Sequence, residues 1–207
     1  NEPYYFAPAA EPFHEVISDW QRDFQVQIGK NHAKYFDREG WLFFTRERFD
    51  LLYPSYGDTY PTFMGAIGMT YEQAGHGRAG LGIDNDEGIE LTLVDRMNHH
   101  TTTGLSTVEI SSQNAKKLND EFGTYFNNDQ LKYKSYVLNG DTDRLKTLTN
   151  LLDKHEIKWG YSNSNSASGF YYGTQKNGSI NAENGIVINT NQPKGKMVKA
   201  LFEPDAK

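Results

Sequence analysis

The sequence predicts an α/β fold in two parts, a partial mixed-sheet domain over residues 1–128 followed by part of a second small α/β domain over residues 129–207. Two long amphipathic helix patterns lie in the first part, but its strand signals, at 41–44 and 69–73, are short. Such a sheet is too small to cover both helices. After residue 129 a strand, helix, strand pattern begins, which is typical of the start of another α/β unit.

The first helix is predicted over residues 12–32. Its apolar residues recur at steps of three and four and therefore share one helical face: Phe13, Ile17, Trp20, Phe24 and Ile28. Residues 1–10 are aromatic and interrupted by proline, which predicts an extended connector. Gly40 interrupts the pattern before the strand expected at 41–44.

The second helix is predicted over residues 107–126. Ser106 and Glu109 match a capping box, in which both side chains accept hydrogen bonds from free backbone N–H groups at a helix start. The apolar face continues through Ala115, Leu118, Phe122 and Phe126. The polar run at 127–129 predicts the end of the helix.

The second part of the chain shows four further strand patterns around one helix. The helix face is formed by Leu145, Leu148 and Leu152. Asn177-Gly178 is the strongest hairpin-turn signal of the sequence, and 161–169 is a polar loop. The expected strands are 133–138, 157–159, 185–188 and 197–202.

Composition excludes several classes of partner and site. The 207 residues carry a net charge of −6 with scattered basic residues, which argues against nucleic acid and against anionic membrane surfaces. Cysteine is absent, so disulfides and thiolate metal sites are excluded. No apolar run is long enough to predict a membrane-spanning segment. The chain begins at Asn1 without a methionine or a signal-like segment, so we expect a piece of a longer protein.

The six histidines (14, 32, 76, 99, 100 and 155) do not form a metal-ligand motif. His14 and His155 each precede a glutamate on an expected helix, where adjacent side chains diverge, and we interpret both as solvated. The pair His99-His100 fits either a ligand role or a structural one. Nucleophile-elbow and phosphate-loop motifs are also missing from the sequence. These patterns contain no complete catalytic set.

A candidate site lies at residues 49–75. Here a loop rich in tyrosine, glycine and proline, with Tyr53, Tyr56 and Asp58, precedes a small-residue run and a strand signal that carries Glu72. Loops that close over a ligand need turn residues and aromatic contacts, and a catalytic carboxylate needs a rigid element to aim it. The alternative interpretation is a buried turn followed by a core strand with an exposed glutamate.

This stretch resembles the C-terminal part of the catalytic domain of zinc carboxypeptidases of the carboxypeptidase A type. In that family a loop tyrosine, a Gly/Ser-rich segment with an aspartate, an aromatic stretch and a strand ending in T-aromatic-E follow one another, as Tyr53, Asp58, Tyr60 and Glu72 do here. The chain is most similar to a Bacteroidetes-like bacterial branch with YPSYGDTYP, GAIGMTYEQAG and HHTTTGLSTVEIS. That resemblance extends along nearly all 207 residues.

The resemblance implies that Glu72 is the general base and acid of peptide hydrolysis. It implies that Tyr53 or its rival Tyr56 covers the substrate, and that Asp58 shapes the loop and the specificity pocket, although an Asx-turn role fits Asp58 equally. The family binds zinc through a His-x-x-Glu pair and a later histidine that precede this loop. This sequence has no His-x-x-Glu, so we expect no metal ligand in this chain. We also expect the fragment alone to be inactive.

The implied activity is hydrolysis of peptide bonds at the C-termini of peptide or protein substrates by a periplasmic or secreted enzyme. Two alternatives stay open. In the first, the chain is a family member without activity that binds peptides or glycans, for which an aromatic content of 14% is suitable. In the second, it is an α/β structural domain in which the order of the motif residues is accidental. The sequence does not predict an oligomeric state.

Overall fold

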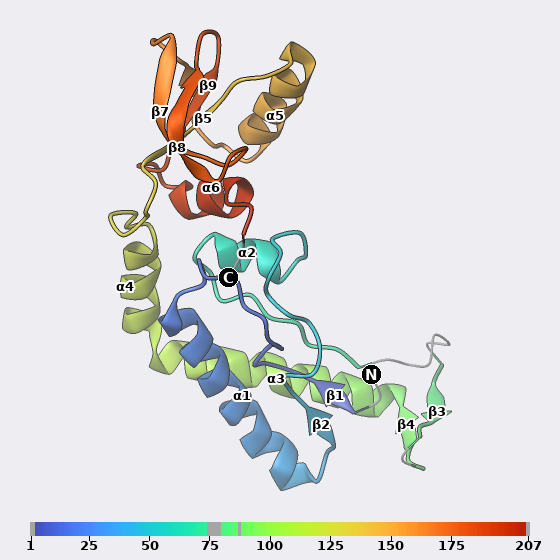
Figure 1. Ribbon diagram of the computed structural model, residues 1–207. Coiled ribbons are helices and arrows are strands. Elements are labelled where there is room, and N and C mark those ends of the chain that lie inside the picture. The colour runs from blue at the N-terminus through green and yellow to red at the C-terminus, as the bar shows by residue number, and fades with distance from the viewer. Residues whose placement is uncertain (1–2, 74–79, 87, 206–207) are drawn as a thin grey trace. The chain divides into compact units, whose positions relative to one another are not determined.

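The computed structural model describes residues 3–73, 80–86 and 88–205 (Figure 1). These residues form six α-helices and several small sheets, which confirms the mixed α/β class. The chain divides into a first unit that runs to Tyr125 and a second unit over Phe126–Asp205. No helix among the described residues has the length and apolarity needed to cross a membrane.

Helix α1 spans Asp19–Glu39, so the predicted bounds of 12–32 are wrong at both ends. The helix begins at Ser18 because a capping box forms there: the Ser18 hydroxyl accepts from the backbone N–H of Gln21, and the Gln21 side chain accepts from the N–H of Ser18. It ends at Gly40, whose φ of 69° is left-handed and suits glycine. Phe13, expected in the helix, instead bridges to Leu51.

The predicted helix over 107–126 is two helices, α3 at Leu93–Gln113 and α4 at Ala115–Tyr125. The capping box predicted at Ser106 is wrong, because the real one forms earlier, between Thr92 and Asp95. A Ser-x-x-Glu pattern also fits the interior of a helix, where its side chains are free to bond a neighbouring helix. Asn114 separates α3 from α4, with its Nδ2 donating to the carbonyl of Ile110.

Strands of the first unit are short. The parallel pair β1 and β2 (Tyr4–Tyr5 and Phe43–Phe44) and the antiparallel pair β3 and β4 (Gly82–Asp84 and Glu90–Thr92) accompany the short helix α2 at Thr59–Phe63. The strand predicted at 41–44 is therefore present only in part. The strand predicted at 69–73 is wrong, since only Glu72 of that stretch pairs, in an isolated antiparallel bridge with Tyr5.

The segment around β1 forms the centre of the first core and is not a surface connector. Tyr4, Tyr5 and Phe6 are at most 1% exposed. One core cluster joins Tyr4 and Phe6 to Phe36, and another joins Ala7 of the same segment to Phe24 and Ile28 of α1. Burial of an aromatic or large aliphatic side chain contributes about 1.5–3 kcal/mol, so this segment is a principal source of stability.

The second unit contains an antiparallel sheet, a hairpin and two helices. The sheet has the order β5-β9-β6, and the hairpin pairs β7 with β8. The helices are α5 and α6. The bounds are β5 Ser135–Leu138, α5 Thr142–Lys154, β6 Gly160–Tyr161, β7 Ser166–Tyr171, β8 Lys176–Asn181, β9 Ile186–Asn189 and α6 Gly195–Phe202.

Four expectations for the second unit need correction. The polar loop predicted at 161–169 is strand at both ends, because β6 includes Tyr161 and β7 begins at Ser166. The strand predicted at 197–202 is helix α6, because its apolar residues lie one and four positions apart, as on one helical face. Asn177-Gly178 lies within β8, and the hairpin instead turns at 172–175, where Gln175 takes a left-handed φ of 54°. The strand predicted at 157–159 begins at Gly160.

Candidate functional site

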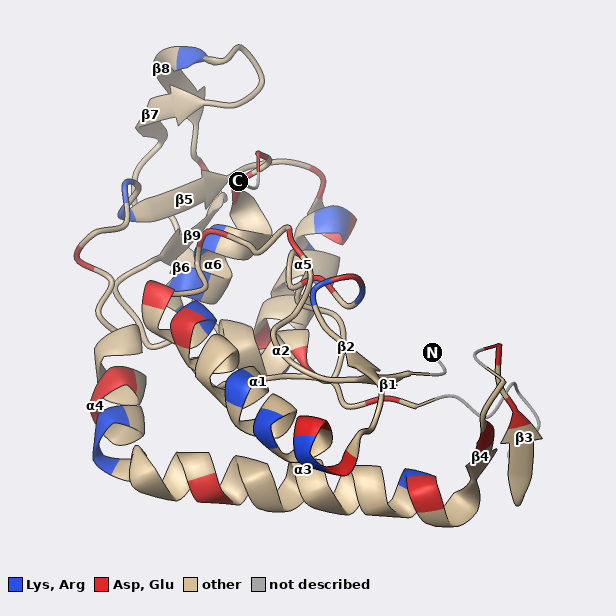
Figure 2. Ribbon diagram, turned by 90° about the horizontal axis from the view of Figure 1, so that it is seen from below, with Lys and Arg blue, Asp and Glu red and all other residues tan. Residues whose placement is uncertain are grey.

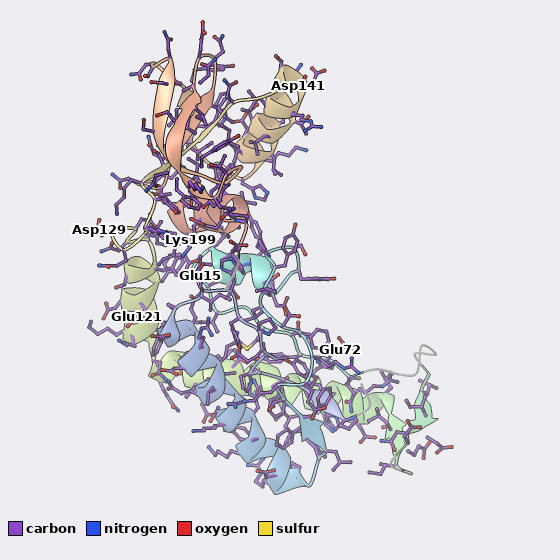
Figure 3. The ribbon with its side chains drawn as sticks, viewed as in Figure 1. Glu15, Glu72, Glu121, Asp129, Asp141 and Lys199 are labelled. Carbon is purple, nitrogen blue, oxygen red and sulfur yellow. The ribbon has the colours of Figure 1, made fainter. Side chains whose placement is uncertain are left out.

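The backbone of Glu72 is fixed to the core strand β1. The N–H of Tyr5 donates to the carbonyl of Glu72 at 2.7 Å, and the N–H of Glu72 donates back to the carbonyl of Tyr5 at 3.1 Å. Tyr5 is 1% exposed, whereas Glu72 is half-buried. Figure 3 marks the position of Glu72. The backbone at Glu72 is therefore fixed to a rigid segment through two hydrogen bonds.

Two glutamines of α1 hold the stretch that leads to Glu72. Nε2 of Gln21 donates to the carbonyls of Thr62 and Ala66, both at 2.8 Å. Nε2 of Gln25 donates to the carbonyl of Gly68 at 2.9 Å. Both glutamines are buried, and a buried amide is stable only when it is paired. Helix α1 thus fixes the backbone between α2 and Glu72.

Asp58 is tied to the same stretch. Its Oδ2 accepts from the hydroxyl of Thr70 at 2.7 Å, and its backbone carbonyl accepts from the hydroxyl of Thr62 at 2.7 Å. Gly68 lies so close that an added Cβ would be 1.8 Å from the Asp58 carbonyl oxygen. Asp58 stands at the start of α2 without a side-chain capping bond. The structure therefore connects the aspartate of the loop to the T-Y-E segment.

Asp58 also lies near the strand that holds Glu72. Burial raises the pKa of Tyr5, and the negative charge of Asp58 raises it further. The hydroxyl of Tyr5 donates to the carbonyl of Arg48 at 2.9 Å. Asp58, Tyr5 and Glu72 thus belong to one neighbourhood of the first unit.

The two candidate loop tyrosines point to solvent. Tyr53 is 70% exposed and Tyr56 is 73% exposed. The loop itself is ordered by backbone contacts: the N–H of Ser55 donates to the carbonyl of Tyr53, and the N–H of Tyr56 donates to the hydroxyl of Thr59. Both tyrosines have the exposure that contact with a ligand requires, so both stay candidates.

Tyr71, the neighbour of Glu72, is anchored in the interior. Its hydroxyl lies 2.9 Å from Nε2 of His32 and 2.6 Å from the hydroxyl of Thr107, and it donates to the sulfur of Met69 at 3.0 Å. Burial raises the pKa of Tyr71 to about 12 and lowers the pKa of His32 to about 4. Both side chains are therefore neutral near pH 7.

This network continues from α1 into α3. Nδ1 of His32 lies 2.8 Å from the hydroxyl of Ser106, which also accepts from Nδ2 of Asn31 at 2.7 Å. Glu109 accepts from Asn31 and from the hydroxyl of Tyr35, both at 2.8 Å. Sequence reasoning missed this network. The available signal was the polar stripe His99, Thr103 and Ser106, which lies on one face of α3 and is buried there.

His99 and His100 lie within α3 and contact the core around Tyr4. Nδ1 of His99 lies 2.7 Å from Oε1 of Gln73, and its ring packs edge-on to Trp41. Burial lowers the pKa of His99. His100 contacts the hydroxyl of Tyr4 through Nδ1 at 2.8 Å. These contacts are structural, although Nε2 of His99 is buried without a hydrogen-bond partner in the described part of the chain.

The interpretation of His14 as a solvated helix residue is wrong. His14 is 2% exposed and precedes α1, and its Nδ1 accepts from the N–H of Val16 while its ring packs against Phe63. The apolar neighbours of the turn explain its burial. His155 is half-buried at the C-terminus of α5, and His76 lies outside the described residues.

The described residues do not fit a zinc site. Within 3–73, 80–86 and 88–205, no group of three or more histidine, cysteine or carboxylate side chains is placed to hold a metal ion. A protein zinc site takes three or four such ligands. The zinc implied by the resemblance therefore has no ligand set in this part of the chain.

The comparisons with protein-family models, curated proteins and solved structures found no match to this chain.

Proposed function

We propose that this chain carries the general base and the substrate-covering loop of a zinc metallocarboxypeptidase that hydrolyses peptide bonds at C-termini. The observation that supports this most directly is the double fixation of Glu72. Its backbone is paired with Tyr5, and its neighbour Tyr71 is held by His32. A general base needs such an orientation before substrate arrives.

In this proposal Glu72 accepts the proton of the attacking water and delivers it to the leaving amine. Zinc, when bound, polarises the scissile carbonyl and acidifies the water. The described residues offer no group of three or more ligands for it, so the proposal assigns the ligands to another segment, as in the family, and expects no activity from this chain alone. Tyr53 or Tyr56 covers the substrate, and Asp58 orients their loop through Thr70. The proposed location is periplasmic or secreted.

The test is Glu72→Gln in a protein that joins this chain to a segment with the family's zinc ligands. Glutamine keeps the size of the side chain but cannot accept the proton. We expect kcat on a C-terminally free peptide to fall by about 10²- to 10⁴-fold, with zinc content and folding unchanged. Glu47→Gln is the matched control, because Glu47 is exposed. A kcat of Glu72→Gln within about threefold of wild type would contradict the assignment.

The second candidate is a binding module without catalytic activity. The exposure of Tyr53 and Tyr56 supports it, since aromatic side chains on one loop suit contact with a peptide or glycan. In that case the wild-type protein has no turnover, and Glu72→Gln changes neither the turnover nor the affinity for the ligand. Tyr53→Ala and Tyr56→Ala would weaken binding. Equilibrium binding and turnover measured on the same four proteins separate the two functions.

A further inference from the structure

A cavity of about 480 Å³ lies in the second unit between the hairpin and the three-stranded sheet. Consecutive residues of β5 and its flanks, 132–139, line one side, and consecutive residues 167–172 of β7 and the turn line the other. Successive residues of a strand point to opposite faces, so a wall made of consecutive residues is a strand edge. Figure 2 shows β7 between β5 and β8.

The edge of β5 that lines the cavity has free backbone groups. Among the described residues, β5 is an outer strand of its sheet and pairs only with β9. The N–H of Thr190 donates to the carbonyl of Lys134, and bonding alternates along an antiparallel pair. The backbone N–H and C=O groups of residues 134, 136 and 138 therefore face β9. The N–H and C=O groups of Ser135 and Val137 face the other way, toward the cavity.

The same argument applies to β7. In the part of the chain that the structure describes, this strand pairs only with β8, and the N–H of Ala182 donates to the carbonyl of Asn165. With the register Ser166–Asn181, the odd-numbered residues of β7 face β8. The backbone groups of Ser168 and Phe170 therefore face away from β8, and both residues line the cavity. Two strand edges with unused donors and acceptors thus border one space.

The space between the edges is open and partly apolar. Gly169 and Gly178 are paired across the hairpin and line the cavity, and a Cβ added to either would meet nothing within 4 Å. Aromatic side chains form one end, where Tyr133 stacks with Phe170 at 6.3 Å between ring centroids. Side chains that alternate along an inserted strand would find an open side at the glycines and an aromatic side at Tyr133.

The charge at this cavity is positive. Lys132 and Lys134 line it, and none of its lining residues is acidic. The ammonium of Lys132 lies 4.8 Å from the ring centroid of Tyr133, and interaction with Tyr133 raises the pKa of Lys132. The nearby carboxylate of Glu203 accepts from the hydroxyls of Tyr136 and Tyr172, both at 2.6 Å. The charge of Glu203 also raises the pKa of Lys132 and so offsets part of its positive charge. The two lysines of the lining together still favour an anionic partner.

We propose that this cavity, named the β5–β7 slot, binds an extended acidic peptide segment of another protein by strand addition. The segment would pair with Ser135 and Val137 on one edge and with Ser168 and Phe170 on the other. It would join the two sheets of the second unit into one. Edge strands are used in this way by peptide-binding domains. The inference does not depend on Glu72 or on the proposed peptidase activity.

The test is the binding of a fluorescein-labelled, C-terminally amidated peptide of sequence Glu-Val-Thr-Val-Glu-Val-Thr, measured by fluorescence anisotropy. Gly169→Trp would fill the slot, and Lys132→Glu would reverse its charge at an exposed position. We expect either change to weaken binding by about tenfold or more. Lys146→Glu is the matched control, because Lys146 is exposed on α5 and outside the slot, and it should change affinity less than threefold.

Two further peptides identify the mode of binding. A version with N-methyl groups on alternate amides loses the backbone donors and should not bind, and a version with lysine in place of both glutamates should bind at least about tenfold more weakly. Circular dichroism verifies that the variants are folded. The proposal is overturned if the peptide does not bind, if Lys132→Glu binds as wild type does, or if both control peptides bind equally well. Dimerisation through the slot, detected by light scattering and abolished by Gly169→Trp, would also overturn it.

Discussion

Acid should destabilise the first unit through His32. Burial lowers the pKa of this imidazole from 6.5 to about 4, so between these values the unfolded chain binds a proton that the folded chain excludes. The stability that His32 contributes is complete above pH 6.5 and falls as the pH drops toward 4. The linkage between protonation and folding lowers the free energy of unfolding by about 2 kcal/mol at pH 5 and by about 3 kcal/mol below pH 4.

The assay is urea unfolding at pH 7.5 and pH 5.0, followed by tryptophan fluorescence in a Trp159→Phe background. Trp20 and Trp41 then report on the first unit alone. The variant His32→Asn removes the titrating group. Its free energy of unfolding should depend on pH less than that of wild type, by about 2 kcal/mol between the two conditions. Comparison of the two proteins cancels the contributions of all other titrating groups.

Tyr71→Phe is the control for the loss of hydrogen bonds. It removes the hydroxyl that lies 2.9 Å from Nε2 of His32 but keeps the imidazole. It should lower stability at pH 7.5 by about 1–3 kcal/mol and should still lose stability in acid. The reasoning is refuted if His32→Asn and wild type lose the same stability between pH 7.5 and 5.0, to within about 0.5 kcal/mol.

Two other predictions concern the backbone near the site and a helix cap. Gly68→Ala should destabilise the first unit by about 1–3 kcal/mol, because its Cβ would meet the Asp58 carbonyl oxygen at 1.8 Å. In Gly104→Ala of α3 the added Cβ meets nothing within 4 Å, so this variant should stabilise the unit by up to about 1 kcal/mol. Urea unfolding of both variants tests the contrast, and equal effects would contradict it. Asp141→Ala should cost the second unit about 1 kcal/mol, because Asp141 accepts from the N–H groups of Asp143 and Arg144 at the start of α5; an unchanged melting temperature would be evidence against this cap.

Helix periodicity predicted that helices exist but not where they begin. The apolar steps from Trp20 to Ile28 do lie in α1, yet the pattern also included Phe13, which pairs with Leu51. Helix starts depend on which side chain reaches a free N–H group, and several serines and threonines are available for this. Ser106 looked like a cap, but its hydroxyl is used by Asn31 and His32 of α1. No local pattern distinguishes the two uses.

The burial of residues 4–7 was also beyond sequence reasoning, because it depends on partners distant in the chain. Tyr4 pairs with Phe43 in β1 and β2, and its hydroxyl meets Thr103 on α3. The loop around Tyr53 and Asp58 was recognisable because turn residues and aromatics mark it locally. The connection of this loop to the segment of Glu72, through the hydrogen bond between Thr70 and Asp58, was not recognisable from the sequence.

The buried polar network holds Tyr71, the neighbour of Glu72, in a fixed position. An interior of hydrogen-bonded polar groups is rarely more stable than a well-packed apolar one, so stability alone does not account for His32 and Ser106 between α1 and α3. Their geometry fixes the hydroxyl of Tyr71. Adjacent residues of an extended segment point to opposite sides, so an inward Tyr71 directs Glu72 outward. In the proposed function, the network therefore exchanges some stability for the direction of one carboxylate.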